Sequence, residues 1–248
     1  MYEKALSFIK NRRLAVAEKR EFKKNAELAS LYSIFKRSPE ARWILGKTEC
    51  LRLYKLIKQY RPKNILELGL GIGASAAVIA LASDANAKIT SMEQYEKCVR
   101  IAKELIPQEL QKKINMVYSE PYAFKNDKIS RYQYFSGYKN LPYGAGPFDF
   151  ILMDGPGGWV ESDQLVKVPN GDIINLLPCM APGCKILIDG RKSAVELYER
   201  FLSNYLRTVE KAHNYTAMER LPRPLKNLDE IEVIDLNLES RQRKGYFD

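Results

Sequence analysis

Short apolar runs alternate with segments of helical character from residue 64 onward, and this alternation constrains the fold more than any other feature. The expected strands cover residues 64–68, 88–92, 114–118, 148–153 and 185–188, and the expected helices cover residues 74–82, 95–105, 173–180 and 193–206. The run 148–153 is almost unbroken in its apolar character, which is typical of a strand covered on both faces. Strands that alternate with helices form parallel sheets with helical crossovers. We therefore predict an α/β fold with a doubly wound, mostly parallel sheet.

Two further strand-like runs follow near the end of the chain, at residues 208–221 and 230–238. Pro222, Arg223 and Pro224 separate them, and no helical segment lies between them. Strands that are joined without a crossover pair in the antiparallel sense. We predict that these runs form a C-terminal antiparallel hairpin at one edge, which completes a seven-stranded sheet.

The first quarter of the chain has a different, helical character. Residues 2–36 contain neither Pro nor Gly. We expect one helix there, a second helix with Ser38 as its N-cap and Pro39 at its first position, and a third helix from Thr48 to Arg61. The chain thus divides into a helical extension, residues 1–61, and an α/β domain, residues 62–248.

The extension is also strongly basic. Residues 1–63 hold 17 Lys and Arg against six Asp and Glu, whereas the remaining residues hold 23 against 24. Positive charge concentrated in this way is typical of a surface that binds RNA or another polyanion. The alternative is a solvated helical face on an extension that covers a cofactor cleft or contacts a second copy in a homodimer.

Several classes of protein are excluded by what the sequence lacks. The longest uninterrupted apolar run, residues 76–82, has seven residues, whereas a membrane-spanning helix needs about 20. No secretory signal is recognisable at the N-terminus, and the four cysteines show no metal-ligand spacing, so we predict a cytoplasmic protein with free thiols. Because His213 is the single histidine, a site that needs two histidines is excluded.

The first expected strand leads into a turn with three glycines, Gly69, Gly71 and Gly73, after which a helix begins near Ser75. Glycine lets the backbone turn sharply and lets a ligand approach without a Cβ in the way. The N-terminus of the following helix favours a negative group on that ligand. The turn alone also fits the loose dinucleotide fingerprint, so a nicotinamide cofactor stays open at this point.

Glu93 ends the second expected strand, twenty residues after Gly73. An acidic residue at this place can accept hydrogen bonds from both hydroxyl groups of a ribose. The sequence therefore predicts a nucleoside derivative as the ligand.

These segments together resemble the class I S-adenosylmethionine-dependent methyltransferases. Residues 67–73 resemble motif I of that family, and Pro182 and Gly183 resemble its entry to the fifth strand. The resemblance covers roughly residues 62–240 and implies that Glu93 binds the ribose, that Ser119 and Glu120 contact the adenine, and that Asp154 ends the fourth strand at the active site. The predicted cofactor-binding residues are Glu67, Gly69, Gly71, Gly73, Ser75, Glu93, Ser119, Glu120 and Asp154.

The charge of Glu67 favours S-adenosylmethionine over a nicotinamide cofactor. A carboxylate at this turn can face the ammonium group of S-adenosylmethionine, but it would repel the pyrophosphate of NAD. An NAD-dependent oxidoreductase is therefore the weaker alternative function.

Asp154 and Asp189 are the predicted catalytic residues, because they end neighbouring strands where open α/β sheets place their chemistry. Two carboxylates there could bind Mg²⁺, as in the catechol-type and sugar O-methyltransferases that this arrangement resembles. In those enzymes Asn commonly follows the second acid, whereas Gly190 stands here. Tyrosines mixed with basic residues over 118–143 suit a sugar, a phenol or a stacked base. We expect O-methylation of a small molecule such as a saccharide or a polyhydroxylated metabolite, with RNA or another polyanion as the alternative acceptor.

Overall fold

The computed structural model describes residues 16–125, 134–156, 159–161, 164–166, 169–212 and 214–225. Its centre is a seven-stranded sheet in the order β10-β11-β9-β6-β1-β2-β3. In chain order the strands are β1 (Asn64–Leu68), β2 (Lys88–Glu93), β3 (Ile114–Tyr118), β6 (Phe148–Met153), β9 (Met180–Asp189), β10 (Leu206–Lys211) and β11 (Tyr215–Arg220). The first five pair in parallel, and β11 pairs antiparallel with both β9 and β10. The predicted fold class is confirmed.

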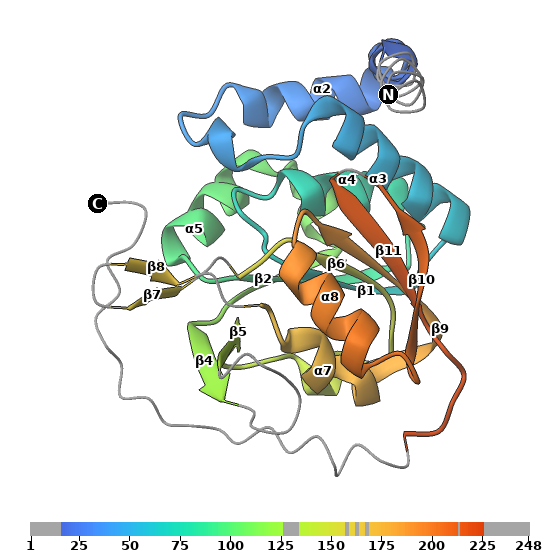
Figure 1. Cartoon of the computed structure of the whole chain (residues 1–248). Helices are drawn as coiled ribbons and strands as arrows, with labels where there is room; N and C mark the ends of the chain where they lie inside the picture. The colour runs from blue at the N-terminus through green and yellow to red at the C-terminus, as the bar shows by residue number, and fades with distance from the viewer. Residues whose placement is uncertain are drawn as a thin grey trace, which may run out of the picture.

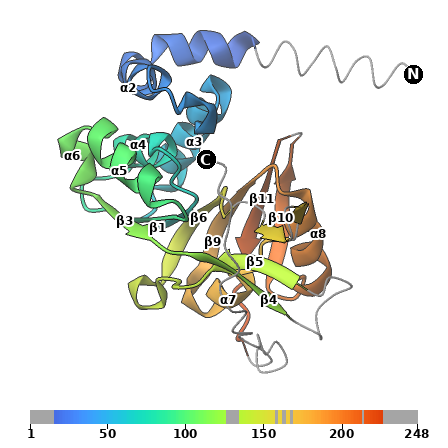
Figure 2. The ribbon, with the colours of Figure 1, turned by 90° about the vertical axis from the view of Figure 1, so that its left-hand side faces the viewer.

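Helices cover both faces of this sheet (Figures 1 and 2). One face carries α2 (Ala26–Lys36), α3 (Lys47–Tyr60), α4 (Ala74–Ala82), α5 (Glu96–Leu105) and α6 (Gln108–Gln111), and the other carries α7 (Asp172–Leu176) and α8 (Lys192–Phe201). Successive strand residues alternate between the two layers, since Ile65 lies in the first buried cluster and Leu66 in the second. This alternation is what a sheet buried on both faces requires.

Short elements complete the described part of the chain. They are the hairpin of β4 (Pro121–Lys125) and β5 (Tyr134–Tyr138), the hairpin of β7 (Trp159–Glu161) and β8 (Gln164–Val166), and the 3₁₀ turns η1 (Ala41–Trp43), η2 (Tyr143–Ala145) and η3 (Leu177–Cys179).

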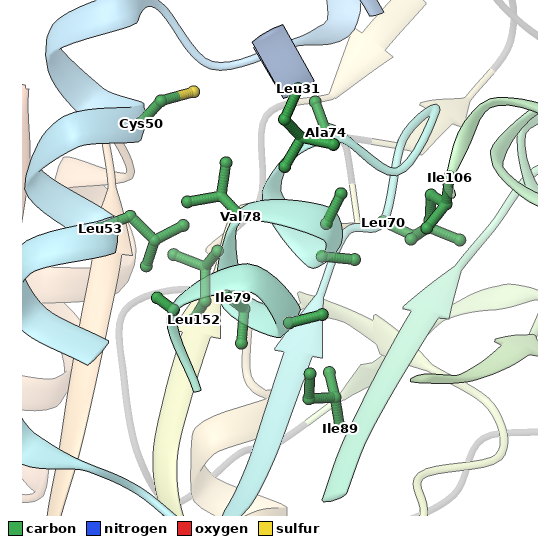
Figure 3. Close-up of a cluster of buried hydrophobic side chains, with 14 of the residues drawn as sticks. Leu31, Cys50, Leu53, Leu70, Ala74, Val78, Ile79, Ile89, Ile106 and Leu152 are labelled. Carbon is green, nitrogen blue, oxygen red and sulfur yellow. The ribbon is translucent and has the colours of Figure 1, made fainter. Parts of the chain in front are cut away.

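The helix α4 joins the N-terminal helices to the sheet. Eight of its nine residues are buried, and they are mostly small, so neighbouring helices can approach it closely. Figure 3 shows Leu31 of α2, Leu53 of α3 and Leu152 of β6 gathered around Val78 of α4. Buried packing is therefore continuous across the predicted boundary between residues 61 and 62, and the division into two domains stays a prediction.

The N-terminal helices differ from the predicted ones at their ends. Residues 1–15 lie outside the described part, and the helix over residues 16–24 stops at Asn25. The Asn25 side chain accepts a hydrogen bond from the Leu28 N–H at 3.1 Å, so it caps a new helix, α2. The helix predicted at Ser38 and Pro39 is wrong, because this segment forms only a turn that leads into η1. The third helix begins one residue before Thr48, with Gly46 as its N-cap.

The antiparallel hairpin is confirmed, but the residues predicted to form it are wrong. The run 208–221 contains the turn between β10 and β11, so it supplies both strands of the hairpin. Asn214 lies in that turn, and Asn is a residue that tight turns favour. The second predicted run, residues 230–238, lies outside the described residues.

Two further predictions can be compared with the structure. All four cysteines, Cys50, Cys98, Cys179 and Cys184, are free thiols, as expected. Among the helices of the described segments, none combines the length and the apolar character needed to cross a membrane.

Replacement of Gly73 should cost the fold stability for two separate reasons. It has a φ of +91°, and a Cβ there would lie 2.7 Å from Cδ1 of Ile106 and 3.0 Å from Cβ of Ala102. We expect Gly73→Ala to lower the free energy of unfolding by roughly 2–4 kcal/mol, because left-handed strain and overpacking add together. Urea denaturation measures this change.

Gly183→Ala is the matched control for that substitution. Gly183 also has a positive φ, +81°, but nothing lies within 4 Å of its Cβ position. It should lose only about 1–2 kcal/mol, from strain alone. Equal losses in the two variants would contradict the packing role assigned to Gly73.

Candidate functional site

A large cavity lies at the point where the chain reverses its direction across the sheet. Strand β1 pairs with β2 on one side and with β6 on the other, and open α/β sheets bind their ligands at such a switch point. The cavity has a volume of about 820 Å³. Its lining includes six predicted site residues, namely Gly69, Gly71, Ser75, Glu93, Asp154 and Asp189. The N-terminal region also contributes to the lining, with Arg42, Ile44, Leu45, Gly46 and Glu49.

Two glycines let the loops after β1 and β6 meet at the wall of the cavity. A Cβ on Gly69, which has a φ of +106°, would lie 2.6 Å from the Gly155 nitrogen. A Cβ on Gly155 would lie 2.6 Å from Cα of Gly69 and 2.8 Å from the Tyr138 hydroxyl. The loops after β1 and β6 therefore touch backbone to backbone, and any side chain at either position would force them apart.

Gly73 has a packing role beside the one predicted for it. It is not among the residues that line the cavity, and its Cβ position is crowded by Ala102 of α5 and by Ile106, the residue that follows α5. Its part in binding a ligand stays a prediction.

The Glu93 carboxylate ties the turns after β1 and β2 together. Its Oε2 accepts the Gly71 N–H at 2.6 Å, and its Oε1 accepts the N–H groups of Gln94 and Tyr95 at 2.8 and 3.0 Å. Burial raises the pKa of Glu93 to about 7, although these three hydrogen bonds act in the opposite direction. The acid predicted to bind a ribose thus also organises the glycine turn.

Glu67 is fully buried behind the turn and keeps one carboxylate oxygen without a partner. Its Oε2 accepts a hydrogen bond from the Ser91 hydroxyl at 2.6 Å, while Oε1 has no hydrogen-bond partner among the described residues. Burial raises the pKa of Glu67 to about 7, against the lowering effect of the Ser75 and Ser91 hydroxyls. A buried carboxylate oxygen that lacks a partner is costly, so this residue suits a ligand that brings a positive group.

Asp154 faces the cavity beside a guanidinium group that sequence reasoning missed. The Asp154 side chain is 41% exposed, and Nη2 of Arg191 lies 3.8 Å from its Oδ1. Loss of solvent contact inside the cavity raises the pKa of Asp154 to about 7; Arg191 lowers it, and Asp189 and Glu93 raise it further. At neutral pH this carboxylate can therefore exist in both protonation states, as a general base requires.

Asp189 lies on the side of the cavity that the N-terminal helices cover. Burial raises its pKa, as does the Glu49 carboxylate, whereas Arg191 and Arg52 lower it. The Asn214 side chain donates a hydrogen bond to Oε1 of Glu49 at 2.6 Å. This bond joins α3 to the hairpin turn across the cavity.

The donor set at Asp154 and Asp189 does not fit a Mg²⁺ site. Within the described ranges, no three Asp, Glu, His or Cys side chains group closely enough to hold one metal ion. The Arg191 guanidinium also stands beside Asp154, where a dication would be repelled. The Mg²⁺ prediction is untested, and the arrangement disfavours it.

Two predicted adenine contacts do not reach the cavity lining. The Ser119 side chain is buried and accepts the Asn140 N–H at 3.0 Å, and Glu120 is exposed. Of the aromatic segment, Tyr138 lines the cavity and donates a hydrogen bond to the Met92 carbonyl at 3.3 Å. The side chains of residues 122–134 and His213 lie outside the described residues.

Comparison with known proteins agrees with this geometry. A family model described as O-methyltransferase matches residues 19–155, which is more than half of the chain. The chain belongs to the O-methyltransferase family. The resemblance to class I S-adenosylmethionine-dependent methyltransferases is thereby confirmed, and the match also includes most of the N-terminal extension.

Solved structures share the fold at low sequence identity. An S-adenosylhomocysteine-bound methyltransferase of Podospora anserina, PaMTH1, is 13% identical with a TM-score of 0.53, over 86% of this chain and 97% of that one. A methyltransferase of Geobacter sulfurreducens is 15% identical with a TM-score of 0.52, over 79% and 88% of the two chains. No curated protein sequence matches this chain.

The pKa of Glu67 predicts how stability depends on pH. Because its pKa is about 7 in the folded protein against an ordinary value of 4.5, the folded state binds more protons than the unfolded state between these values. The contribution of Glu67 to stability is therefore fully present below about pH 4.5 and is lost as the pH rises through 7.

Glu67→Gln should remove this dependence and stabilise the ligand-free protein at pH 8 by roughly 1–3 kcal/mol, while cofactor affinity falls. Urea denaturation at pH 5 and pH 8 measures the first effect, and calorimetric titration with S-adenosylhomocysteine measures the second. A variant that is less stable than the wild type at pH 8 would show that the carboxylate is compensated in the ligand-free protein.

Proposed function

We propose that this methyltransferase transfers the methyl group of S-adenosylmethionine to a hydroxyl oxygen of a small molecule, such as a saccharide or a polyhydroxylated metabolite. One observation carries the proposal. The glycine turn with Glu93 and the acids Asp154 and Asp189 line one continuous cavity of about 820 Å³, which is large enough for a cofactor and a small acceptor side by side.

The fit of the cofactor rests on the unpartnered oxygen of Glu67 and on the Glu93 carboxylate. Glu67 would face the cofactor's ammonium group, directly or through water, and Glu93 would accept the ribose hydroxyls. We keep Ser119 and Glu120 as the proposed adenine contacts. When bound, S-adenosylmethionine supplies an electrophilic methyl group on a positively charged sulfur. The leaving group is the neutral thioether S-adenosylhomocysteine.

Asp154 is the proposed general base. It would accept the proton of the acceptor hydroxyl on its Oδ atoms, so that the oxygen's electron pair is free to form the new bond to carbon. Asp189, Glu49 and Asn214 line the same cavity, and such polar groups can hydrogen bond the other hydroxyls of the acceptor. The expected gain in rate comes mainly from alignment of the two substrates.

Asp154→Asn tests this role. The variant should lose at least 100-fold in methyl transfer, the usual contribution of a general base, and should bind S-adenosylhomocysteine nearly as the wild type does. Transfer of labelled methyl groups to a panel of saccharides and polyhydroxylated compounds measures turnover, and calorimetry measures binding.

The same calorimetry separates the rival function. Tight binding of NAD without binding of S-adenosylmethionine or S-adenosylhomocysteine would reject the proposal in favour of an oxidoreductase. Full turnover by Asp154→Asn would remove Asp154 as the base.

A polyanionic acceptor such as RNA is the second candidate, and the helix over residues 16–24 favours it. The acids of this helix pair with α3, Glu18 with Arg52 at 3.2 Å and Glu21 with Lys55 at 2.6 Å. Its remaining charged residues, Lys19, Arg20, Lys23 and Lys24, are exposed. The acidic side chains thus face the protein, and basic ones face solvent.

Gel-shift titrations with single-stranded RNA at several salt concentrations test this candidate. If RNA binds there, Lys19→Gln with Lys23→Gln should flatten the slope of log affinity against log salt by about 1.4, since each lost contact contributes about 0.7. The control pair Lys88→Gln with Lys112→Gln removes two exposed lysines of the α/β domain. Absence of RNA binding even at low salt would reject the candidate.

A further inference from the structure

Arg191 occupies the part of the site where a metal ion would be expected to bind two strand-end carboxylates. Its Nη2 donates a hydrogen bond to the Asp154 carbonyl and lies 3.8 Å from the Asp154 Oδ1. Its Nη1 donates to the Pro156 carbonyl at 2.9 Å. The guanidinium is thus fixed to the loop that leaves β6 by two different backbone groups, with its side chain 24% exposed.

The surroundings of this guanidinium are acidic on several sides. Asp154 of the β6 loop and Asp189 of β9 both interact electrostatically with Arg191, and both line the cavity with it. Glu93 from β2 also acts electrostatically on Asp154. A positive group is needed there, because carboxylates that crowd one cavity cannot all remain charged without one.

Arg191 also keeps an unused hydrogen-bond donor. Its Nε is buried and has no acceptor among the described residues. A buried donor without a partner is costly, so the side chain is held in place by more than its own local hydrogen bonds.

We propose that Arg191 is the resident cation of the site and takes the place of Mg²⁺ between Asp154 and Asp189. The site then binds no divalent metal in the working enzyme. A guanidinium cannot accept a carboxylate or a hydroxyl into a coordination shell, but it offsets negative charge and donates hydrogen bonds in a fixed plane. This proposal deepens the proposed O-methyl transfer and rests on it for the role of Asp154.

Three features distinguish this arrangement from an incomplete metal site. The two carboxylates have no third Asp, Glu, His or Cys close enough to complete a metal site within the described residues. Gly190 follows Asp189 and offers no side-chain ligand. The cation itself is Arg191, which follows Gly190. The end of β9 and the turn after it therefore supply a carboxylate and a guanidinium group that are separated by one residue.

A Mn²⁺ titration tests the proposal. Binding is measured as the loss of the electron paramagnetic resonance signal of free Mn²⁺. The protein is the full chain with S-adenosylhomocysteine present. We expect the wild type to leave the signal unchanged. Arg191→Gln should bind Mn²⁺ at least tenfold more tightly, because the two carboxylates are then left without a resident cation, and Asp189→Asn in the same chain should abolish the gain.

Two control variants make the result specific. Lys192→Gln removes a neighbouring exposed cation, and Arg191→Lys keeps the charge, so both should behave as the wild type does. Circular dichroism and S-adenosylhomocysteine binding show whether each variant is folded. If Arg191→Gln does not fold, Mn²⁺ binding by the wild type still tests the proposal.

Mn²⁺ binding by the wild type that Asp154→Asn or Asp189→Asn abolishes would overturn the proposal. So would an Arg191→Gln variant that folds and gains no more affinity than Lys192→Gln. None of these measurements uses methyl transfer, so failure of the proposed O-methylation would be recognised separately.

Discussion

The contact between Gly69 and Gly155 is the constraint on which the site depends. A Cβ on either glycine would collide with the backbone of the other, so only glycines let the loops after β1 and β6 meet at the wall of the cavity that both line. A buried polar network holds the loop after β6 at the Gly155 carbonyl. Asn170 donates to the Gly155 carbonyl at 3.3 Å and to Asp172 at 3.0 Å, and the Tyr198 hydroxyl donates to the Asn170 carbonyl at 2.5 Å. Because these three groups hydrogen bond to one another and to the loop, the loop that carries Asp154 is positioned before any ligand binds.

The same region concentrates acids whose burial costs free energy. Glu67, Glu93 and Asp154 all have pKa values raised to about 7, chiefly by loss of solvent. Hydrogen bonds from the glycine turn offset part of this cost for Glu93, whereas Glu67 has an oxygen without a partner. A cavity of this charge favours a ligand with positive groups and disfavours one that carries a pyrophosphate. The ligand-free site is therefore less stable than it could be, in the way expected of a site shaped for a cationic cofactor.

The sequence predicts the parts of the fold that depend on local pattern. The bounds of β1 and β6 match the prediction, because each is an apolar run buried on both faces. The hairpin was misplaced because Asn214 is a single turn residue inside an otherwise strand-like run. Arg191 could not be found, since its contact with Asp154 joins residues 37 positions apart and exists only after β6 and β9 pair. The packing role of Gly73 could not be predicted, because the pattern does not reveal that Ile106 fills the space beside it.

The N-terminal helices belong to the site as well as to the core. Their buried side chains continue into the cluster around α4, and the family match begins at residue 19. Beyond α2, one wall of the cavity is formed by Arg42, Ile44, Leu45, Gly46 and Glu49. The hydrogen bond from Asn214 to Glu49 joins this wall to the opposite edge of the sheet, across 165 positions of sequence. The shape of this side of the cavity is therefore set by two distant segments rather than by the sheet alone, so changes in α3 or in the hairpin turn would alter it directly.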